Sequence, residues 1–137
     1  MLERVLVAVD GSERSDRAVR MAAAIARGVG AEMTLIHVVE RESSPVLSED
    51  EANEMDKAEG RRILAASAEA ARATDMEVRT ELKIGHAPIQ ILRYASAYRP
   101  QLLFIGATGL GKVAEFLMGS VTKEVIKDAK TSVVVVR

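Results

Sequence analysis

The stretch that decides the fold is residues 101–122, with the sequence QLLFIGATGLGKVAEFLMGSVT. Its opening apolar run, LLFI, has the length of a buried strand and is closed at once by a glycine. Gly106 and Gly109 form a Gly-x-x-Gly pattern, and nine residues later come Gly119 and Ser120. From Ser120 onward apolar residues recur at helical spacing. The stretch therefore predicts a strand, a glycine turn and a helix that begins at this serine.

This order of elements is a phosphate-binding arrangement. Glycines let the backbone come close to an anion and adopt positive φ. The unpaired N–H groups of the first helical turn, with the positive end of the helix dipole, can then hold the anion. The spacing is not that of a Walker A loop, because Val113 follows Lys112 where that loop needs a hydroxyl residue for magnesium. Glycine pairs after a strand also occur in simple tight turns. The prediction of a phosphate site therefore depends on the spacing of all four motif residues.

Working outward, strand-like and helix-like segments alternate along the chain. Continuous apolar runs at 5–9, 31–39 and 131–137 are typical of buried strands, and residues 77–84 alternate as a half-covered or edge strand does. With the strand already described they make five strands, separated by helical patterns. This β-α-β-α-β-α-β-α-β order predicts an α/β, Rossmann-like fold, an open five-stranded parallel sheet with helices on both faces. We see no linker, so one domain spanning 1–137 is expected.

Capping residues and glycine stops predict where the helices begin and end. Ser15 or Asp16 is expected to cap the first helix, and Gly28 or Gly30 to end it. A capping box at 48–51 is expected to start the second helix. The residues expected to face inward are Ala18, Met21, Ala22, Ile25 and Val29 in the first helix, Ala52, Met55, Ala58, Leu64, Ala65, Ala68 and Ala71 in the second, and Ile89, Leu92, Ala95 and Ala97 in the third.

The composition is that of an ordinary globular protein and argues against several kinds of partner and site. Of the 137 residues, 48% are hydrophobic and 28% are charged, and 19 basic against 20 acidic residues leave a net charge of −1. No charge block would recruit nucleic acid or an anionic membrane, so neither is an expected partner. Without cysteine there is no disulfide, thiolate metal site or cysteine nucleophile. No apolar stretch reaches membrane-spanning length and no signal-peptide core is visible, so we expect a cytoplasmic protein.

Two strands end in residues suited to binding a ligand. In open α/β sheets ligands bind beyond the carboxyl ends of the strands, where the strand order reverses. The first strand ends in Asp10, Gly11 and Ser12, and the fourth ends in the glycine turn. If these strands are neighbours, the order is 3-2-1-4-5 and Asp10 faces the same crevice as the turn. Asp10 can instead serve only its own turn, since aspartate is a routine turn residue. His37 is expected in the core, and His86 in a loop near the site.

The pattern Gly-x-x-Gly, nine residues, Gly-Ser resembles the nucleotide-binding signature of the universal stress protein family, and the resemblance extends from the first strand to the last. It implies the same strand order and an ATP site. Ala8 stands where many ATP-binding members have proline; alanine there also occurs in members that do not bind ATP, which usually lack the glycine signature. The residues that the resemblance assigns to the nucleotide are Asp10 with Ala8 and Val9 beside it, and Val38, near the adenine; Ile105, Gly106, Thr108 and Gly109 at the ribose and phosphates; and Gly119, Ser120, Val121 and Thr122 at the phosphates.

The resemblance implies an adenine-nucleotide-binding protein that acts as a stress-response regulator or sensor through bound ATP. Mg²⁺ is the usual companion of a triphosphate, and Asp10 is suited to help hold it. Phosphoryl transfer needs a base or nucleophile aimed at a phosphate. Near the motif we find Ser120, Thr122 and Lys112, but no general base and no arginine within the turn. We therefore assign no catalytic residue and no dedicated metal ligand. A slow ATP hydrolase and a dimeric partner-binding module with a structural nucleotide stay open as alternatives.

The last strand is expected to join two copies of the chain. Residues 133–136 are four consecutive valines, in a strand that the order 3-2-1-4-5 places at an edge. An apolar edge strand has unpaired N–H and C=O groups, which pairing with its own copy across a two-fold axis would satisfy. Resemblance to universal stress proteins, which dimerise through their last strands, implies the same. We expect an antiparallel homodimer built on residues 132–136, with cover by a helix or by the loop at 41–47 as the alternative.

Overall fold

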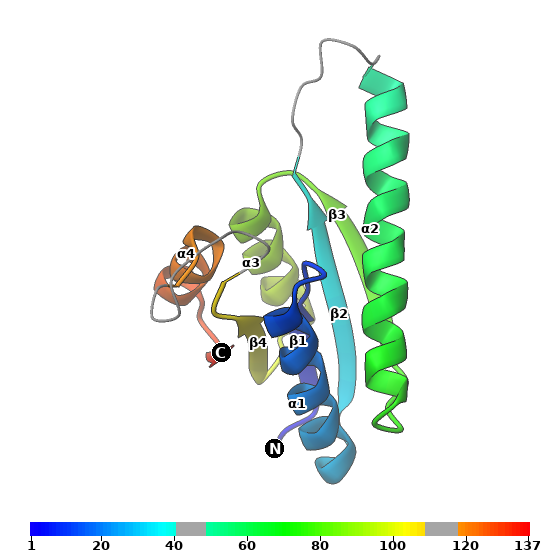
Figure 1. Cartoon of the computed structure of the whole chain (residues 1–137). Coiled ribbons are helices and arrows are strands. Elements are labelled where there is room, and N and C mark those ends of the chain that lie inside the picture. The colour runs from blue at the N-terminus through cyan, green and yellow to red at the C-terminus, as the bar shows by residue number, and fades with distance from the viewer. Residues whose placement is uncertain (41–48, 109–117) are drawn as a thin grey trace.

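The computed structural model describes residues 1–40, 49–108 and 118–137. Over this part of the chain five strands alternate with four helices (Figure 1). No helix in these ranges combines the length and the apolar character that crossing a membrane requires. The elements are β1 (Arg4–Ala8), α1 (Glu13–Val29), β2 (Glu32–Val39), α2 (Glu49–Arg72), β3 (Arg79–Ile84), α3 (Ala87–Tyr98), β4 (Leu102–Gly106), α4 (Ser120–Asp128) and β5 (Ser132–Val136).

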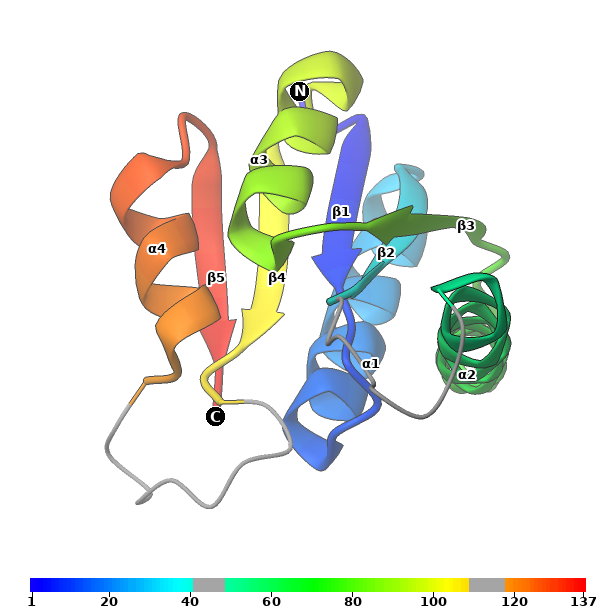
Figure 2. The same cartoon turned by 90° about the horizontal axis from the view of Figure 1, so that it is seen from above.

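The strands form one parallel sheet in the order β3-β2-β1-β4-β5, which confirms the predicted topology. Strand β1 lies at the centre, where Val7 is level with Leu35 of β2 and with Phe104 of β4. Figure 2 shows the strands in this order. From β1 the chain adds strands first on one side, β2 and β3, and then on the other, β4 and β5. The strand order therefore reverses between β1 and β4, whose carboxyl ends lie side by side. The strands β3 and β5 are the two edges.

Helices α1 and α2 cover one face of the sheet, and α3 and α4 cover the other (Figure 2). Successive side chains of a strand point to opposite faces. Val5 and Val7 of β1 therefore belong to the core under α1 and α2. Leu6 belongs to a second core, which it shares with Ile105 of β4 and Ile91 of α3. Because helices cover both faces, the side chains on both sides of the central strands are mostly apolar, and this explains the apolar runs in the sequence.

The start of α1 differs from the prediction. Its N-cap is Ser12, whose hydroxyl accepts a hydrogen bond from the N–H of Ser15 at 3.2 Å. Ser15 lies inside the helix, and its own hydroxyl accepts the N–H of Asp10 at 3.2 Å. Ser15 and Asp16 are therefore not the cap. Gly30 ends the helix in the left-handed conformation, in agreement with one of the two predicted stops.

The buried face of α1 also differs in part from the prediction, and the first turn of the helix lies very close to the sheet. A Cβ added to Gly106 would lie 3.1 Å from the Cβ of Arg14, so strand and helix approach at a bare glycine. No side chain would fit between β4 and α1 at this point. Met21, Ile25 and Val29, which were expected inside, are exposed. Ala18 and Ala22 are buried as predicted, and α1 also buries Ser15, Val19, Ala23 and Ala26.

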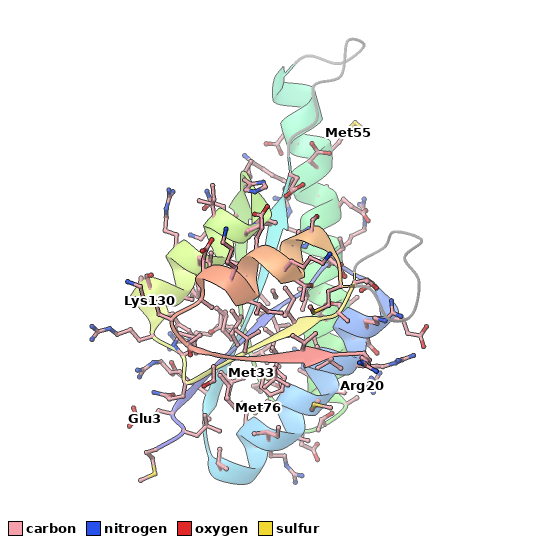
Figure 3. The ribbon with its side chains drawn as sticks, turned by 90° about the vertical axis from the view of Figure 1, so that its left-hand side faces the viewer. Glu3, Arg20, Met33, Met55, Met76 and Lys130 are labelled. Carbon is pink, nitrogen blue, oxygen red and sulfur yellow. The ribbon has the colours of Figure 1, made fainter. Side chains whose placement is uncertain are left out.

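Four further inward predictions are wrong: Met55 and Ala65 of α2 and Ile89 and Ala97 of α3 are exposed. Met55 of α2 is 61% exposed because its end of the helix projects past the sheet, as Figures 1 and 3 show; Figure 3 also labels Met33, which is buried under α1 and α2. Ile89 of α3 is 51% exposed, whereas Ile91 is buried. Of the other residues expected inside, Leu64 and Ala71 are buried, Ala58, Ala68, Leu92 and Ala95 are half-buried, and the burial of Ala52 lies outside the described residues.

Gly60 lies within α2, where glycine costs a helix about 1 kcal/mol relative to alanine. Packing explains its presence: a Cβ there would lie 2.7 Å from Cδ1 of Leu82 and 3.0 Å from Cγ2 of Val39. We expect Gly60→Val to lower the free energy of unfolding by about 1–3 kcal/mol through overpacking, as measured by urea unfolding. Gly28→Val is the matched control, since an added Cβ there meets no described atom within 4 Å. Equal stability of the two variants would contradict this account of α2.

Candidate functional site

A cavity of about 300 Å³ opens at the carboxyl ends of β1, β2 and β4, beside the N-terminal ends of α3 and α4. The strand order reverses here, which is where open α/β sheets bind ligands. The volume is within the range of small-molecule sites. The lining residues are Ala8, Val9, Asp10, Ser15, Ile36, His37, Val38, Ala87, Ile91, Ile105, Gly106, Gly119, Ser120, Val121 and Thr122.

The turn after β1 places a carboxylate in the cavity wall. Gly11 has a φ of 83°, a left-handed conformation that glycine adopts without strain. Oδ1 of Asp10 accepts the N–H of Ser12 at 2.9 Å, so Asp10 does stabilise its own turn. A carboxylate has further acceptor sites, and Asp10 also lines the cavity. The turn role therefore leaves Asp10 able to contact a ligand or a metal ion.

Strand β2 runs past the end of β1, and this extension forms one side of the cavity. Val9 donates its N–H to the carbonyl of Ile36 at 2.9 Å, and on the other edge of β2 the carbonyl of Val39 accepts the N–H of Gly85 at 3.0 Å. Successive residues of a parallel strand bond to its two neighbours alternately. The N–H and C=O of Val38 therefore point to the β1 side. Because β1 has already ended there, these groups face the cavity that Val38 lines.

His37 is half-buried beside the same side of the cavity. Its Nδ1 lies 2.7 Å from the carbonyl oxygen of Val9. A carbonyl oxygen can only accept, so Nδ1 donates this hydrogen bond. Sequence reasoning placed His37 in the core alone; the structure adds it to the cavity wall.

Helix α4 begins at the predicted Gly-Ser pair with its first N–H groups uncapped. Gly119 is the N-cap and has no side chain to bond them. The first hydrogen bond of the helix runs from the N–H of Lys123 to the carbonyl of Gly119 at 3.0 Å. The N–H groups of Ser120, Val121 and Thr122 therefore have no intrahelical partner, as at the start of any helix. They belong to residues that line the cavity.

Hydrogen bonds hold α4 to the end of β4. The N–H of Gly119 donates to the carbonyl of Ala107 at 2.8 Å, and the hydroxyl of Thr122 donates to the carbonyl of Gly106 at 2.8 Å. Thr122 is 3% exposed. Its hydroxyl is therefore engaged in the fold, and only its backbone is available to a ligand.

Helix α3 contributes Ala87 and Ile91 to the cavity, and its N-terminus is capped from within the protein. A carboxylate oxygen of Glu40 accepts the N–H of Ala87 at 3.0 Å. Nε2 of His86 lies 3.2 Å from a carboxylate oxygen of Glu124, so His86 connects α3 to α4 outside the cavity wall. The two helix ends thus differ. A glutamate accepts a backbone N–H at the start of α3, whereas no side chain caps the start of α4.

The structure brings nearly all of the predicted site residues into one cavity. Every one of them lines it except Thr108, which is buried beside it, and Gly109, which lies outside the described residues. Sequence reasoning missed Ser15, Ile36, His37, Ala87 and Ile91. They belong to no motif; the one available pattern was the periodicity of α3, and it pointed to Ile89 instead.

The described cavity wall is suited to binding more than to catalysis. Asp10 and His37 are the titratable residues among those that line it, and each already makes a hydrogen bond within the protein. Across the three described ranges, no group of three or more His, Cys, Asp or Glu could hold a metal ion. One side of the cavity is apolar with free backbone groups, and another carries the uncapped helix end.

Comparisons with known proteins agree on one family. Residues 1–137 match the model of the universal stress protein family. The universal stress protein YxiE of Bacillus subtilis is 29% identical over the full length of both chains. The structure of UspA from Lactobacillus plantarum superimposes with a TM-score of 0.85 at 25% identity, covering 99% of this chain and 98% of that one. A universal stress protein solved in complex with cAMP gives a TM-score of 0.76 at 27% identity, covering 99% and 97%.

Proposed function

This chain belongs to the universal stress protein family, and we propose on that premise that its cavity binds an adenine nucleotide, ATP accompanied by Mg²⁺. Through the bound nucleotide the protein acts as a stress-response regulator or sensor in the cytoplasm. The observation that carries the proposal is the presence in one cavity of an apolar wall with free backbone groups at Val38 and an uncapped helix end at Ser120.

The side of the cavity between β2 and α3 suits an adenine ring. Ile36 and Ile91 offer apolar surface to the ring faces. The N–H and C=O of Val38 present a donor and an acceptor to one edge, and adenine has an acceptor (N1) beside a donor (the 6-amino group) on its pairing edge. Guanine reverses this order. The related protein solved with cAMP holds an adenine nucleotide, which supports the same class of ligand.

The α4 end of the cavity suits the phosphates. Anions bind at helix N-termini because the free N–H groups point at them and the helix dipole favours negative charge. Gly119, Ser120, Val121 and Thr122 act here through their backbones, since the Thr122 hydroxyl is engaged with the fold. The other predicted residues of the turn, Ile105, Gly106, Thr108 and Gly109, are assigned to the ribose and to the approach of the phosphates.

Mg²⁺ fits this site only as a companion of the nucleotide. It is commonly bound by one or two carboxylates together with substrate phosphates. Asp10 supplies one carboxylate at the cavity wall, and the described residues gather no larger ligand group. The nucleotide phosphates must therefore complete the coordination.

Calorimetric titration of the intact chain tests the proposal. We expect saturable binding of one ATP per chain in the presence of Mg²⁺, and weaker binding of GTP because its pairing edge opposes the groups of Val38. Titration with ATP in excess chelator measures the contribution of Mg²⁺. Absence of saturable ATP binding by the folded protein would reject the proposal.

We expect hydrolysis of bound ATP to be slow or absent. Asp10 and His37 are the titratable side chains in the described wall, and hydrogen bonds to the β1 turn and to the Val9 carbonyl fix their orientation, so we assign neither as a base aimed at a phosphate. A turnover assay with Mg²⁺ and ATP should give a rate well below about 1 per second, the low end of ordinary enzymes. A rate at or above that value would point to a catalytic group beyond Asp10 and His37.

The proposal includes an antiparallel homodimer built on β5. Strand β5 is an edge of the sheet, bonded to β4 on one side. Val133, Val134 and Val135 are only partly buried in the single chain, and Val136 is buried. Pairing two copies would satisfy the free backbone edge and bury more of these valines.

A further inference from the structure

Arg14 lies in the first turn of α1, beside the turn that follows β4. Its Cβ would be 3.1 Å from a Cβ added to Gly106. Its guanidinium donates a hydrogen bond to the hydroxyl of Thr108. Sequence reasoning found no arginine within the glycine turn, but the fold brings one against it from a helix far away in the chain.

Arg14 differs from the two arginines that follow it in α1. Arg17 pairs with Glu13 at 2.8 Å, and Arg20 pairs with Asp16 at 2.9 Å. In the part of the chain that the structure describes, no carboxylate oxygen lies within 4.0 Å of the Arg14 guanidinium. Arg14 is also half-buried. Charged side chains are rarely taken out of water without a partner, so a half-buried guanidinium with only a neutral hydroxyl favours an anion nearby.

The Arg14 guanidinium and the start of α4 both contact the short segment that follows β4. Ala107 accepts the N–H of Gly119 at 2.8 Å, and the next residue, Thr108, accepts a hydrogen bond from Arg14. The uncapped end of α4 and the Arg14 side chain thus flank a two-residue segment at the end of β4. Both are positive, one through its dipole and the other through a full charge. A chain of phosphates that starts at α4 can therefore extend toward Arg14.

We propose that Arg14 is a specificity-determining residue that contacts the distal phosphates of the bound nucleotide and makes the site prefer a nucleoside triphosphate to a monophosphate. This inference rests on the proposed function, since it requires an adenine nucleotide in the cavity. A guanidinium has five N–H donors in a planar fork, so the bond to Thr108 orients it and leaves donors for phosphate oxygens. Affinity then rises from AMP to ATP, and Arg14 contributes most of the step.

Titration of ATP and AMP into wild-type protein and an Arg14→Gln variant tests this. Glutamine removes the charge and keeps part of the stem and a donor for Thr108. We expect the variant to lose about 10-fold or more in ATP affinity, while AMP affinity changes by no more than about 2-fold. Arg14→Lys should recover part of the loss, because it restores the charge without the fork. Arg20→Gln is the matched control and should change neither affinity, since Arg20, labelled in Figure 3, is exposed. Its guanidinium pairs with Asp16 at 2.9 Å.

The possible outcomes separate the inference from the proposed function. Wild-type protein that binds neither nucleotide rejects both. Wild-type binding with an unchanged ATP-to-AMP affinity ratio in Arg14→Gln rejects the inference alone. An equal loss for both nucleotides also rejects it, because Arg14 then only positions α1 or the turn. If thermal melting shows that Arg14→Gln is unfolded, the ratio in Arg14→Lys decides, and a ratio equal to wild type rejects the inference.

Discussion

Gly119→Val should abolish measurable ATP binding while the domain remains folded. Gly119 is the N-cap of α4, so a branched side chain there stands where backbone N–H groups must meet a phosphate. Loss of two charge-assisted hydrogen bonds at about 1.5–3 kcal/mol each lowers affinity by about 100-fold or more. The φ of −68° and ψ of 164° at Gly119 suit any residue, so the backbone itself is not strained by valine. Calorimetric titration with ATP measures the effect.

Gly119 is a sharper test than the other glycines of the motif. A side chain at Gly106 would collide with α1 at 3.1–3.2 Å, so loss of binding there could reflect a damaged fold. Gly109 lies outside the described residues. Gly28→Val makes the same change on the exposed surface of α1 and should bind ATP as the wild type does. Unchanged ATP affinity in a folded Gly119→Val protein would show that the phosphates do not lie at this helix end.

Val134→Lys should convert the homodimer into a monomer. Val134 is the middle residue of β5, so in an antiparallel pair centred on this strand it lies opposite its own copy. Two lysines would then face each other across the two-fold axis, where like charges destabilise the pair and desolvating them adds to the cost. We expect the dimer dissociation constant to rise by about 100-fold or more, equivalent to roughly 3 kcal/mol. Light scattering at micromolar concentration measures the mass of both proteins.

The control is Val29→Lys, which places the same charge at an exposed position of the last turn of α1. Lysine suits that place, because the helix dipole is negative there, so this variant should stay dimeric. Val134 also packs against the core under α1, and a circular dichroism melt must show that Val134→Lys is folded. A monomeric mass for the unaltered chain would overturn the dimer itself.

Local patterns in the sequence determined the order of strands and helices and, in the site, the positions of Asp10, the glycine turn and the start of α4. Buried parallel strands are recognisable because each must be apolar on both faces, and glycine, proline and capping residues punctuate the segments between them. The chemistry at the ends of the first and fourth strands, Asp10 and the glycine turn, suggested that these strands are neighbours; the family resemblance supported the resulting order, and the structure has it. The start of α4 at Ser120 followed from the glycine-serine pair and the periodicity after it.

Only the tertiary structure decided which face of each helix is inside and which side chains reach the cavity. In α1, Ala22 and Val19 face the sheet and Met21 does not, and this choice depends on how the helix lies against strands distant in the chain. The close approach of the first turn of α1 to Gly106 brings Arg14 to Thr108. Ile91 and His37 reach the cavity for a similar reason, because their places depend on how α3 and β2 lie across the ends of their neighbours. Periodicity in the sequence indicates that a helix has an apolar face. Which of its side chains are buried, and which line the cavity, depends on how the helix packs against the sheet.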